Sequence, residues 1–263
     1  MGKIVSIHSF RGGTGKSNTA ANLAAQVALK GKRVGVVDTD IQSPGIHVLF
    51  GLNEDSMGRT LNDFLHGLCE IQAVAYSVGE HAGNSNGSAG RKLLAGCNLW
   101  LIPSSIRGRE ISRVLREGYD VSRLNEGLQN LIEEMKLDYL FIDTHPGLNE
   151  ETLLSIAISD ILLIILRPDE QDFQGTAVTV DIARSLDVTN LFLMVNKAVP
   201  NTYDYDDLKS LVENNYKAPL KGILPLNFEL ADNASKDLFS LRFPDHAWSK
   251  ELVKVAAAIL EVE

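Results

Sequence analysis

Short apolar runs alternate along the chain with longer stretches in which polar and apolar residues mix. Nearly continuous apolar runs are typical of parallel strands that are buried on both faces. They predict strands at Ile4–His8, Arg33–Asp38, Leu99–Pro103, Tyr139–Asp143, Ile161–Leu166, Leu191–Asn196 and Gly222–Leu224. Helical spacing predicts helices at Lys16–Lys30, Arg109–Met135, Thr176–Leu186 and Trp248–Glu261. The alternation predicts an α/β fold: a doubly wound, mostly parallel sheet with helices on both faces.

The 263 residues are interpreted as one domain, 1–263, because α/β folds often reach this length as a single unit. One low-complexity stretch, "GEHAGNSNGSAGR" at 79–91, is rich in glycine, serine and asparagine. Its composition predicts a flexible loop within the domain.

Composition narrows the class of protein. An apolar content of 44% with 22% charged residues is typical of a globular protein. The net charge of −9 argues against a surface that coats nucleic acid throughout, although a local basic patch in a dimer stays open. Cys69 and Cys97 lack the spacing of a metal site or a disulfide framework, and no apolar run is long enough to be a signal peptide or a membrane span. We therefore expect a reduced, cytoplasmic compartment.

The stretch "SFRGGTGKSN", Ser9 to Asn18, follows the first strand and opens the first helix. Glycines allow the backbone to curl so that its N–H groups face phosphate oxygens, and the helix N-terminus adds a positive dipole. Lys16 would reach the β and γ phosphates, and the Ser17 hydroxyl would bind Mg²⁺. The alternative is a tight turn with a chance lysine; the flanking strand and helix favour the phosphate interpretation.

Within that stretch, "RGGTGKS" resembles the deviant phosphate-binding loop of the MinD/ParA family of P-loop ATPases. The resemblance implies that ATP is bound by Gly12, Gly13, Thr14, Gly15, Lys16, Ser17 and Asn18. Phe10 stands where the ordinary loop has its first glycine, and Arg11 stands where the family has its extra lysine. That lysine crosses the dimer interface to the partner's phosphates, so Arg11 is expected to act in catalysis in trans, as Lys16 does in cis. The alternative is that Arg11 points to solvent.

Two further segments carry the resemblance. "VGVVDTDIQSPG" at 34–45 implies that Asp40 positions the attacking water and that Asp38 lies beside the Mg²⁺. "LDYLFIDTHPG" at 137–147 resembles the strand whose acidic residue, here Asp143, holds the ion through water. Each carboxylate alone could simply end a strand or cap a turn. Three of them at the carboxyl ends of parallel strands beside a phosphate loop favour a metal site. His145 stands where the family has a small residue, and its role is left open.

Weaker matches lie at "LFLMVNK", 191–197, and "LPLNF", 224–228. The resemblance implies that Asn196 contacts the adenine base and that Pro225 fixes the backbone turn beside it. Val199 stands where a guanine-specific site would carry aspartate, which favours ATP over GTP.

The resemblance further implies a Mg²⁺-dependent ATPase that dimerises with ATP, hydrolyses it slowly, and is stimulated by a partner protein that the sequence does not identify. Such switches position or partition DNA, division machinery or other cargo. The tail "HAWSKELVKVAAAILEVE" has few basic residues, so a helix packed on the sheet is favoured over a membrane anchor. Basic residues in the last third, with acidic residues mixed among them, favour nonspecific DNA over membrane; they are Lys209, Lys217, Lys221, Lys236, Arg242 and Lys250.

Two alternatives from other classes stay open. One is an ATP-binding regulatory or scaffold protein with little or no hydrolysis, and the other is a metal-delivery or nitrogenase-reductase-like relative. The second would need paired cysteines at a dimer axis, for which Cys97 is a poor candidate.

Overall fold

The computed structural model describes residues 2–84 and 89–262. Its strands are β1 (Lys3–His8), β2 (Val34–Asp38), β3 (Tyr76–Ser77), β4 (Leu99–Ile102), β5 (Tyr139–Asp143), β6 (Ile161–Leu166), β7 (Asn190–Ala198) and β8 (Leu220–Pro225). All seven strands expected from the apolar runs are present, with ends shifted by up to two residues. The structure adds one strand that the sequence did not predict, β3, because a two-residue strand carries no periodic signal.

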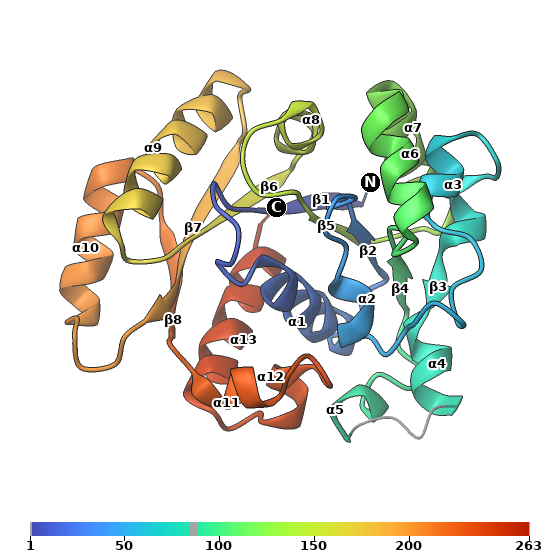
Figure 1. The fold of residues 1–263 in the computed structure, drawn as a ribbon. Helices are drawn as coiled ribbons and strands as arrows, with labels where there is room; N and C mark the ends of the chain where they lie inside the picture. The colour runs from blue at the N-terminus through green and yellow to red at the C-terminus, as the bar shows by residue number, and fades with distance from the viewer. Residues whose placement is uncertain (1, 85–88, 263) are drawn as a thin grey trace.

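The strands form one sheet in the order β3-β4-β2-β5-β1-β6-β7-β8 (Figure 1). Every neighbouring pair is parallel except β3–β4, which is antiparallel. The doubly wound, mostly parallel α/β fold is therefore confirmed. Within the sheet, β2 lies on one side of β1, and β6 lies on the other side. The strand order therefore reverses at β1, and sheets of this kind bind ligands at the carboxyl ends of the strands beside such a reversal.

The helices are α1 (Lys16–Leu29), α2 (Ile46–Leu49), α3 (Leu61–Leu65), α4 (Val78–Asn84), α5 (Ala89–Lys92), α6 (Gly108–Glu117), α7 (Val121–Glu134), α8 (Glu150–Ala157), α9 (Glu170–Ser185), α10 (Tyr205–Tyr216), α11 (Phe228–Asp232), α12 (Phe239–Arg242) and α13 (Ala247–Leu260), with a 3-10 turn at Ile71–Val74. Helices α1 and α13 cover one face of the sheet, and α7, α8 and α9 lie on the other (Figure 1).

Two expected helices are corrected. The single helix expected over 109–135 is two helices, α6 and α7, because Gly118 adopts φ 66° and the Asp120 side chain caps a new helix by accepting from Ser122 N. The helix expected from Thr176 begins at Glu170, because Asp169 caps it by accepting from Asp172 N. Gly175, which looks like a boundary in the sequence, lies inside α9.

The segment 79–91, expected to be a loop, contains most of α4 and the start of α5, while 85–88 lie outside the described residues. The packed tail helix is present as α13, whose apolar stripe of Trp248, Leu252, Val255 and Ile259 is buried. Within residues 2–84 and 89–262, no helix combines the length and the apolar character needed to cross a bilayer.

Candidate active site

The glycine-rich loop joins the carboxyl end of β1 to the first turn of α1. Gly13 has φ 77° and Gly15 has φ 96°, so both lie in the left-handed region that favours glycine. The loop lines a cavity of about 210 Å³ that contains residues 11–18 together with Ser9, Asp40 and Pro146. Seven of the residues expected to bind nucleotide, Gly12 to Asn18, therefore share one cavity with Arg11 and Asp40.

The loop is held from β7. The Asn196 side-chain nitrogen donates to the carbonyl of Thr14 at 2.7 Å, and Lys197 Nζ donates to the carbonyl of Gly13 at 2.7 Å. A Cβ on Gly15 would collide with the Asn196 amide, so glycine is required there on steric grounds as well. The sequence resemblance assigned Asn196 to the base and gave Lys197 no role. Neither contact could be read from the sequence, because 182 positions separate Asn196 from Thr14.

Lys16 and Asp143 form a buried ion pair. The ammonium lies 3.3 Å from Oδ1 of Asp143, and the side chains are 7% and 1% exposed. The other carboxylate oxygen, Oδ2, is buried and has no hydrogen-bond partner among the described residues. A phosphate that attracted Lys16 would leave both oxygens of Asp143 available to a hydrated cation, so the donor set fits Mg²⁺ held through water.

Asp38 and Asp143 are directly opposite each other in the register of β2 and β5. Asp38 is fully buried, and its oxygens accept from the backbone N–H groups of Asp40 at 3.1 Å and Gly45 at 3.2 Å. Burial raises the pKa of Asp38 well above its usual range, and the neighbouring charges of Asp143 and Asp40 raise it further. Asp38 therefore braces the turn that follows β2, and it does not line the loop cavity.

Asp40 reaches the cavity and faces His145. Its Oδ1 lies 3.8 Å from Nε2 of His145, and it also accepts from Ser43 N at 3.1 Å. Burial raises the pKa of Asp40, while the charges of His145 and Lys16 oppose that rise. His145 Nδ1 lies 2.7 Å from the carbonyl oxygen of Pro146, which orients the ring. The structure thus places His145 beside the carboxylate expected to position water.

The two unusual loop residues both contact α9. The Phe10 ring occupies the space where a Cβ on Gly175 would lie, so the glycine inside α9 makes room for it. The Arg11 guanidinium donates to the Gln171 side chain and lies 3.8 Å from Oδ1 of Asp172. Arg11 remains 40% exposed. Arg11, which is expected to act in trans, therefore contacts two residues of its own chain in this structure.

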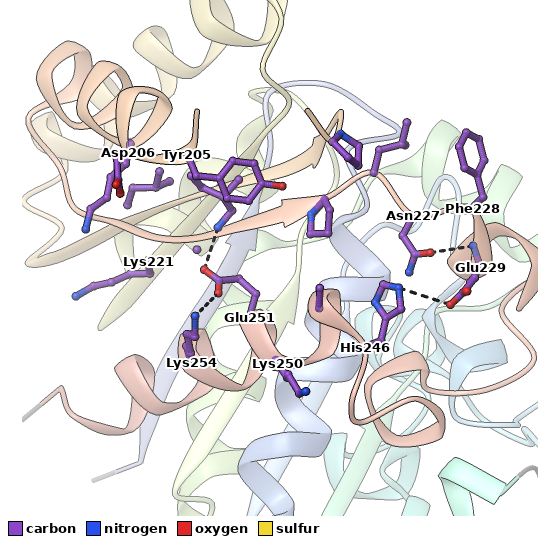
Figure 2. A pocket seen from close by; sticks show the side chains of 18 residues that line it. Tyr205, Asp206, Lys221, Asn227, Phe228, Glu229, His246, Lys250, Glu251 and Lys254 are labelled. Carbon is purple, nitrogen blue, oxygen red and sulfur yellow. Dashed lines mark hydrogen bonds and ion pairs between the residues drawn. The ribbon is translucent and has the colours of Figure 1, made fainter. Parts of the chain in front are cut away.

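Pro225 lies apart from the loop cavity, at the end of the edge strand β8. It lines a separate groove of about 960 Å³ that runs along β8 between α10 and α13 (Figure 2). The outward N–H groups of β8 are already occupied, since Leu220 N donates to Glu213 at 2.9 Å and Ile223 N donates to Glu251 at 3.3 Å. Pro225 and Asn196 lie near the carboxyl ends of neighbouring strands, and of the two only Pro225 lines this groove.

A family model described as "AAA domain" matches residues 2–195, most of the chain, including the loop and all three aspartates. This chain belongs to the MinD/ParA-like P-loop ATPases. The matched range ends one residue before Asn196.

Curated relatives of this MinD/ParA-like ATPase differ in what they are named for. An uncharacterized ATP-binding protein of Methanocaldococcus jannaschii is 25% identical over 99% of this chain and 88% of its own length. A putative septum site-determining protein MinD of Chlorella vulgaris is 25% identical, covering 85% of this chain and 72% of that protein. An iron-sulfur cluster carrier protein of Rickettsia conorii is 26% identical over 90% of this chain and 65% of its own length.

Solved structures share the fold of this MinD/ParA-like chain. The cell division ATPase MinD of Pyrococcus furiosus superposes with a TM-score of 0.81 at 20% identity and full coverage of both chains. MinD of Pyrococcus horikoshii, complexed with Mg-ADP, gives 0.78 at 18% identity, covering 99% and 97%. A putative plasmid partition protein of Borrelia burgdorferi bound to AMPPNP gives 0.75 at 21% identity, covering 99% of each chain.

Proposed function

We propose that this chain is a Mg²⁺-dependent ATPase whose ATP-bound homodimer is a switch for positioning or partitioning intracellular cargo. The observation that carries the proposal is the single cavity in which the curled loop, Lys16, Ser17 and Asp40 meet at the carboxyl edge of the sheet. The family is one of ATPases, and the named relatives include division and partition proteins.

Each residue has a role that its position supports. Backbone N–H groups of the loop and the N-terminus of α1 bind the phosphates of ATP. Lys16 moves from Asp143 to the β and γ phosphates, and Ser17 and Asp143 would hold Mg²⁺, Asp143 through water. The ion, when bound, neutralises charge on the phosphate oxygens. Asp40 accepts a hydrogen bond from the attacking water and so orients it.

Arg11 acts on the partner subunit's nucleotide in the proposed dimer. Its planar guanidinium can bind two phosphate oxygens at once, and its 40% exposure leaves it accessible to a second copy. The contacts with Gln171 and Asp172 must break first. Arg11 is exposed, and Asp172 keeps its ion pair with Arg167 at 3.1 Å, so breaking these contacts leaves no unpaired buried charge and costs about 1 kcal/mol.

The switch needs a surface to act on, and we propose nonspecific DNA. The apolar stripe of α13 is buried against the sheet, so this helix offers no apolar face to lipid. Lys217, Lys236 and Arg242 are exposed in the last third of the chain, and a dimer would bring two such sets together. A partner protein stimulates hydrolysis and returns the dimer to monomers.

Light scattering on the purified chain tests the switch. The Asp40→Ala variant, which we expect to bind ATP and hydrolyse it slowly, is measured with Mg²⁺ and ATP, with Mg²⁺ and ADP, and without nucleotide. A change from monomer to dimer with ATP alone supports the proposal, and binding of that dimer to a DNA duplex but not to anionic liposomes supports the surface. The same mass in all three states would rule out an ATP-gated switch and favour a nucleotide-binding scaffold.

A further inference from the structure

A second groove, of about 470 Å³, lies between α3 with the turn that follows it and α6. We call it the α3–α6 groove, after α3 (Leu61–Leu65) and α6 (Gly108–Glu117). Its volume is in the range of pockets that hold small ligands. None of the loop residues 9–18 lines it, and neither do the three active-site aspartates, so it is distinct from the nucleotide site.

Three arginines of α6 line this groove. Arg109, Arg113 and Arg116 are spaced by four and then three residues, which places their side chains along one face of the helix. Arg113 pairs with Glu117 at 2.9 Å. Among the described residues, Arg109 and Arg116 are exposed and form no direct ion pair, although Asp63, Glu110 and Glu117 line the same groove.

The groove also gathers buried polar atoms that lack partners. Asn62 is only 1% exposed; its Oδ1 accepts from Ser105 N at 2.8 Å, yet its Nδ2 has no partner among the described residues. Nε2 of His66 and Oε2 of Glu110 are also buried, and neither atom has a hydrogen-bond partner among the described residues. Because unsatisfied buried polar groups are costly, three of them lining one groove point to a hydrogen-bonding occupant.

We propose that the α3–α6 groove binds a small phosphate-bearing molecule. Arg109 and Arg116 bind the phosphate oxygens, which suit the guanidinium fork, and Asn62 Nδ2 adds a neutral donor. Oε2 of Glu110 accepts a hydrogen bond from a hydroxyl or amine elsewhere on the ligand. The mixed lining selects for a ligand that carries both an anion and donors.

The carboxylates of the lining argue against a nucleic-acid backbone at this site. Asp63, Glu110 and Glu117 all face the groove and would repel a long polyanion. A compact ligand can place its phosphate on the arginines and its hydroxyl groups on the carboxylates. The proposal does not depend on the ATPase switch, because the groove shares no lining residue with the loop cavity.

The test uses the full chain saturated with ADP and Mg²⁺, so that the loop is occupied, and fructose 1,6-bisphosphate as the probe. Isothermal calorimetry should show binding with a dissociation constant below about 1 mM, and the Asn62 side-chain amide resonance should shift in a ¹⁵N NMR titration. Arg109→Ala and Arg116→Ala should each weaken binding about tenfold, since each removes a charge-assisted contact. Lys30→Ala, which removes an exposed cation outside the groove, should leave the affinity unchanged.

Two further ligands test whether the groove recognises a phosphate group on a small molecule. Citrate carries carboxylates without phosphate, and each carboxylate has less charge and fewer acceptor oxygens than a phosphate group, so citrate should bind at least about tenfold more weakly than the bisphosphate. A DNA duplex should not displace the bisphosphate. No binding up to about 10 mM bisphosphate would overturn the proposal, since that affinity lies below that of a selective site. Equal affinity for citrate would also overturn it, as would binding that survives in both arginine variants, because either result would mean nonselective anion binding.

Discussion

The side-chain nitrogen of Asn196 lies 2.7 Å from the carbonyl oxygen of Thr14, joining the end of β7 to the phosphate-binding loop. Asn196 is 2% exposed, and its Oδ1 accepts from Lys197 N at 2.8 Å. Both ends of the amide are therefore engaged in protein contacts. The loop conformation depends on a strand that follows it by about 180 residues.

We expect Asn196→Ala to weaken ATP binding about tenfold, because losing the hydrogen bond lets the loop sample conformations that do not fit phosphate. Calorimetric titration with ATP and Mg²⁺ measures the change. Asn190→Ala is the matched control, since Asn190 also donates to a carbonyl, that of Asp160 at 2.9 Å, from the opposite end of β7. Unchanged affinity in Asn196→Ala would mean that the loop holds its shape without this contact.

Lys16→Met should abolish tight ATP binding and also destabilise the nucleotide-free chain. Removing the ammonium leaves the Asp143 carboxylate buried without its charge partner, which costs about 3 kcal/mol of unfolding free energy. Urea unfolding without nucleotide measures this loss. The double variant Lys16→Met/Asp143→Asn should recover part of the stability, because no buried charge remains. Equal stability of parent and single variant would show that the pair is not formed in solution.

Arg11→Ala should lower the ATPase rate by about a hundredfold or more, if Arg11 neutralises charge on the partner subunit's nucleotide. Gln171→Ala is the contrasting variant, because it removes the exposed side chain to which the Arg11 guanidinium donates within its own chain. We expect it to keep or raise the rate. Phosphate release is measured at protein concentrations where the dimer forms. A parent-like rate in Arg11→Ala would exclude the trans role.

His145→Gln should shift the pH dependence of hydrolysis. Burial already raises the pKa of Asp40, and the His145 charge opposes this rise, so its removal moves the pKa of Asp40 higher. If ionised Asp40 orients water, the acid limb of the kcat/KM profile moves toward higher pH. His145→Ala should give the same shift, since the charge and not the ring volume is responsible. Superimposable profiles would remove His145 from any electrostatic role.

His8 should make stability depend on pH. Burial, together with the nearby charges of Lys16 and His145, lowers the pKa of His8 to about 3, so His8 stays neutral when folded. Between pH 6.5 and about 3 the unfolded chain binds the extra proton, so stability falls as the pH falls. The contribution lost between pH 7 and pH 5 is about 2 kcal/mol. His8→Asn, which does not titrate, should reduce the difference in unfolding free energy between these pH values by that amount.

Much of the sheet could be predicted because a strand buried on both faces must be apolar along its length, as in β5 and β6. The ends of the helices could not be predicted, because they depend on individual capping side chains and on packing between residues far apart in the sequence. Inside α9, glycine is required at position 175 because the Phe10 ring occupies the space of a side chain there. This contact joins residues 165 positions apart in the sequence. Composition also misled at 79–91, where glycines and an asparagine occur within short helices on either side of 85–88, which lie outside the described residues.

The loop, the order of the aspartate strands and the family can be read from the amino-acid sequence, because they depend on local residue spacing and on apolar runs. The contacts of each polar side chain can be read only from the folded chain. It placed Lys16 on Asp143, Asn196 on the loop backbone, and Arg11 on α9. The physical reason is that hydrogen bonds and ion pairs require approach within about 3–4 Å. Such approach between segments far apart in the chain is set by the packing of the whole sheet and its helices.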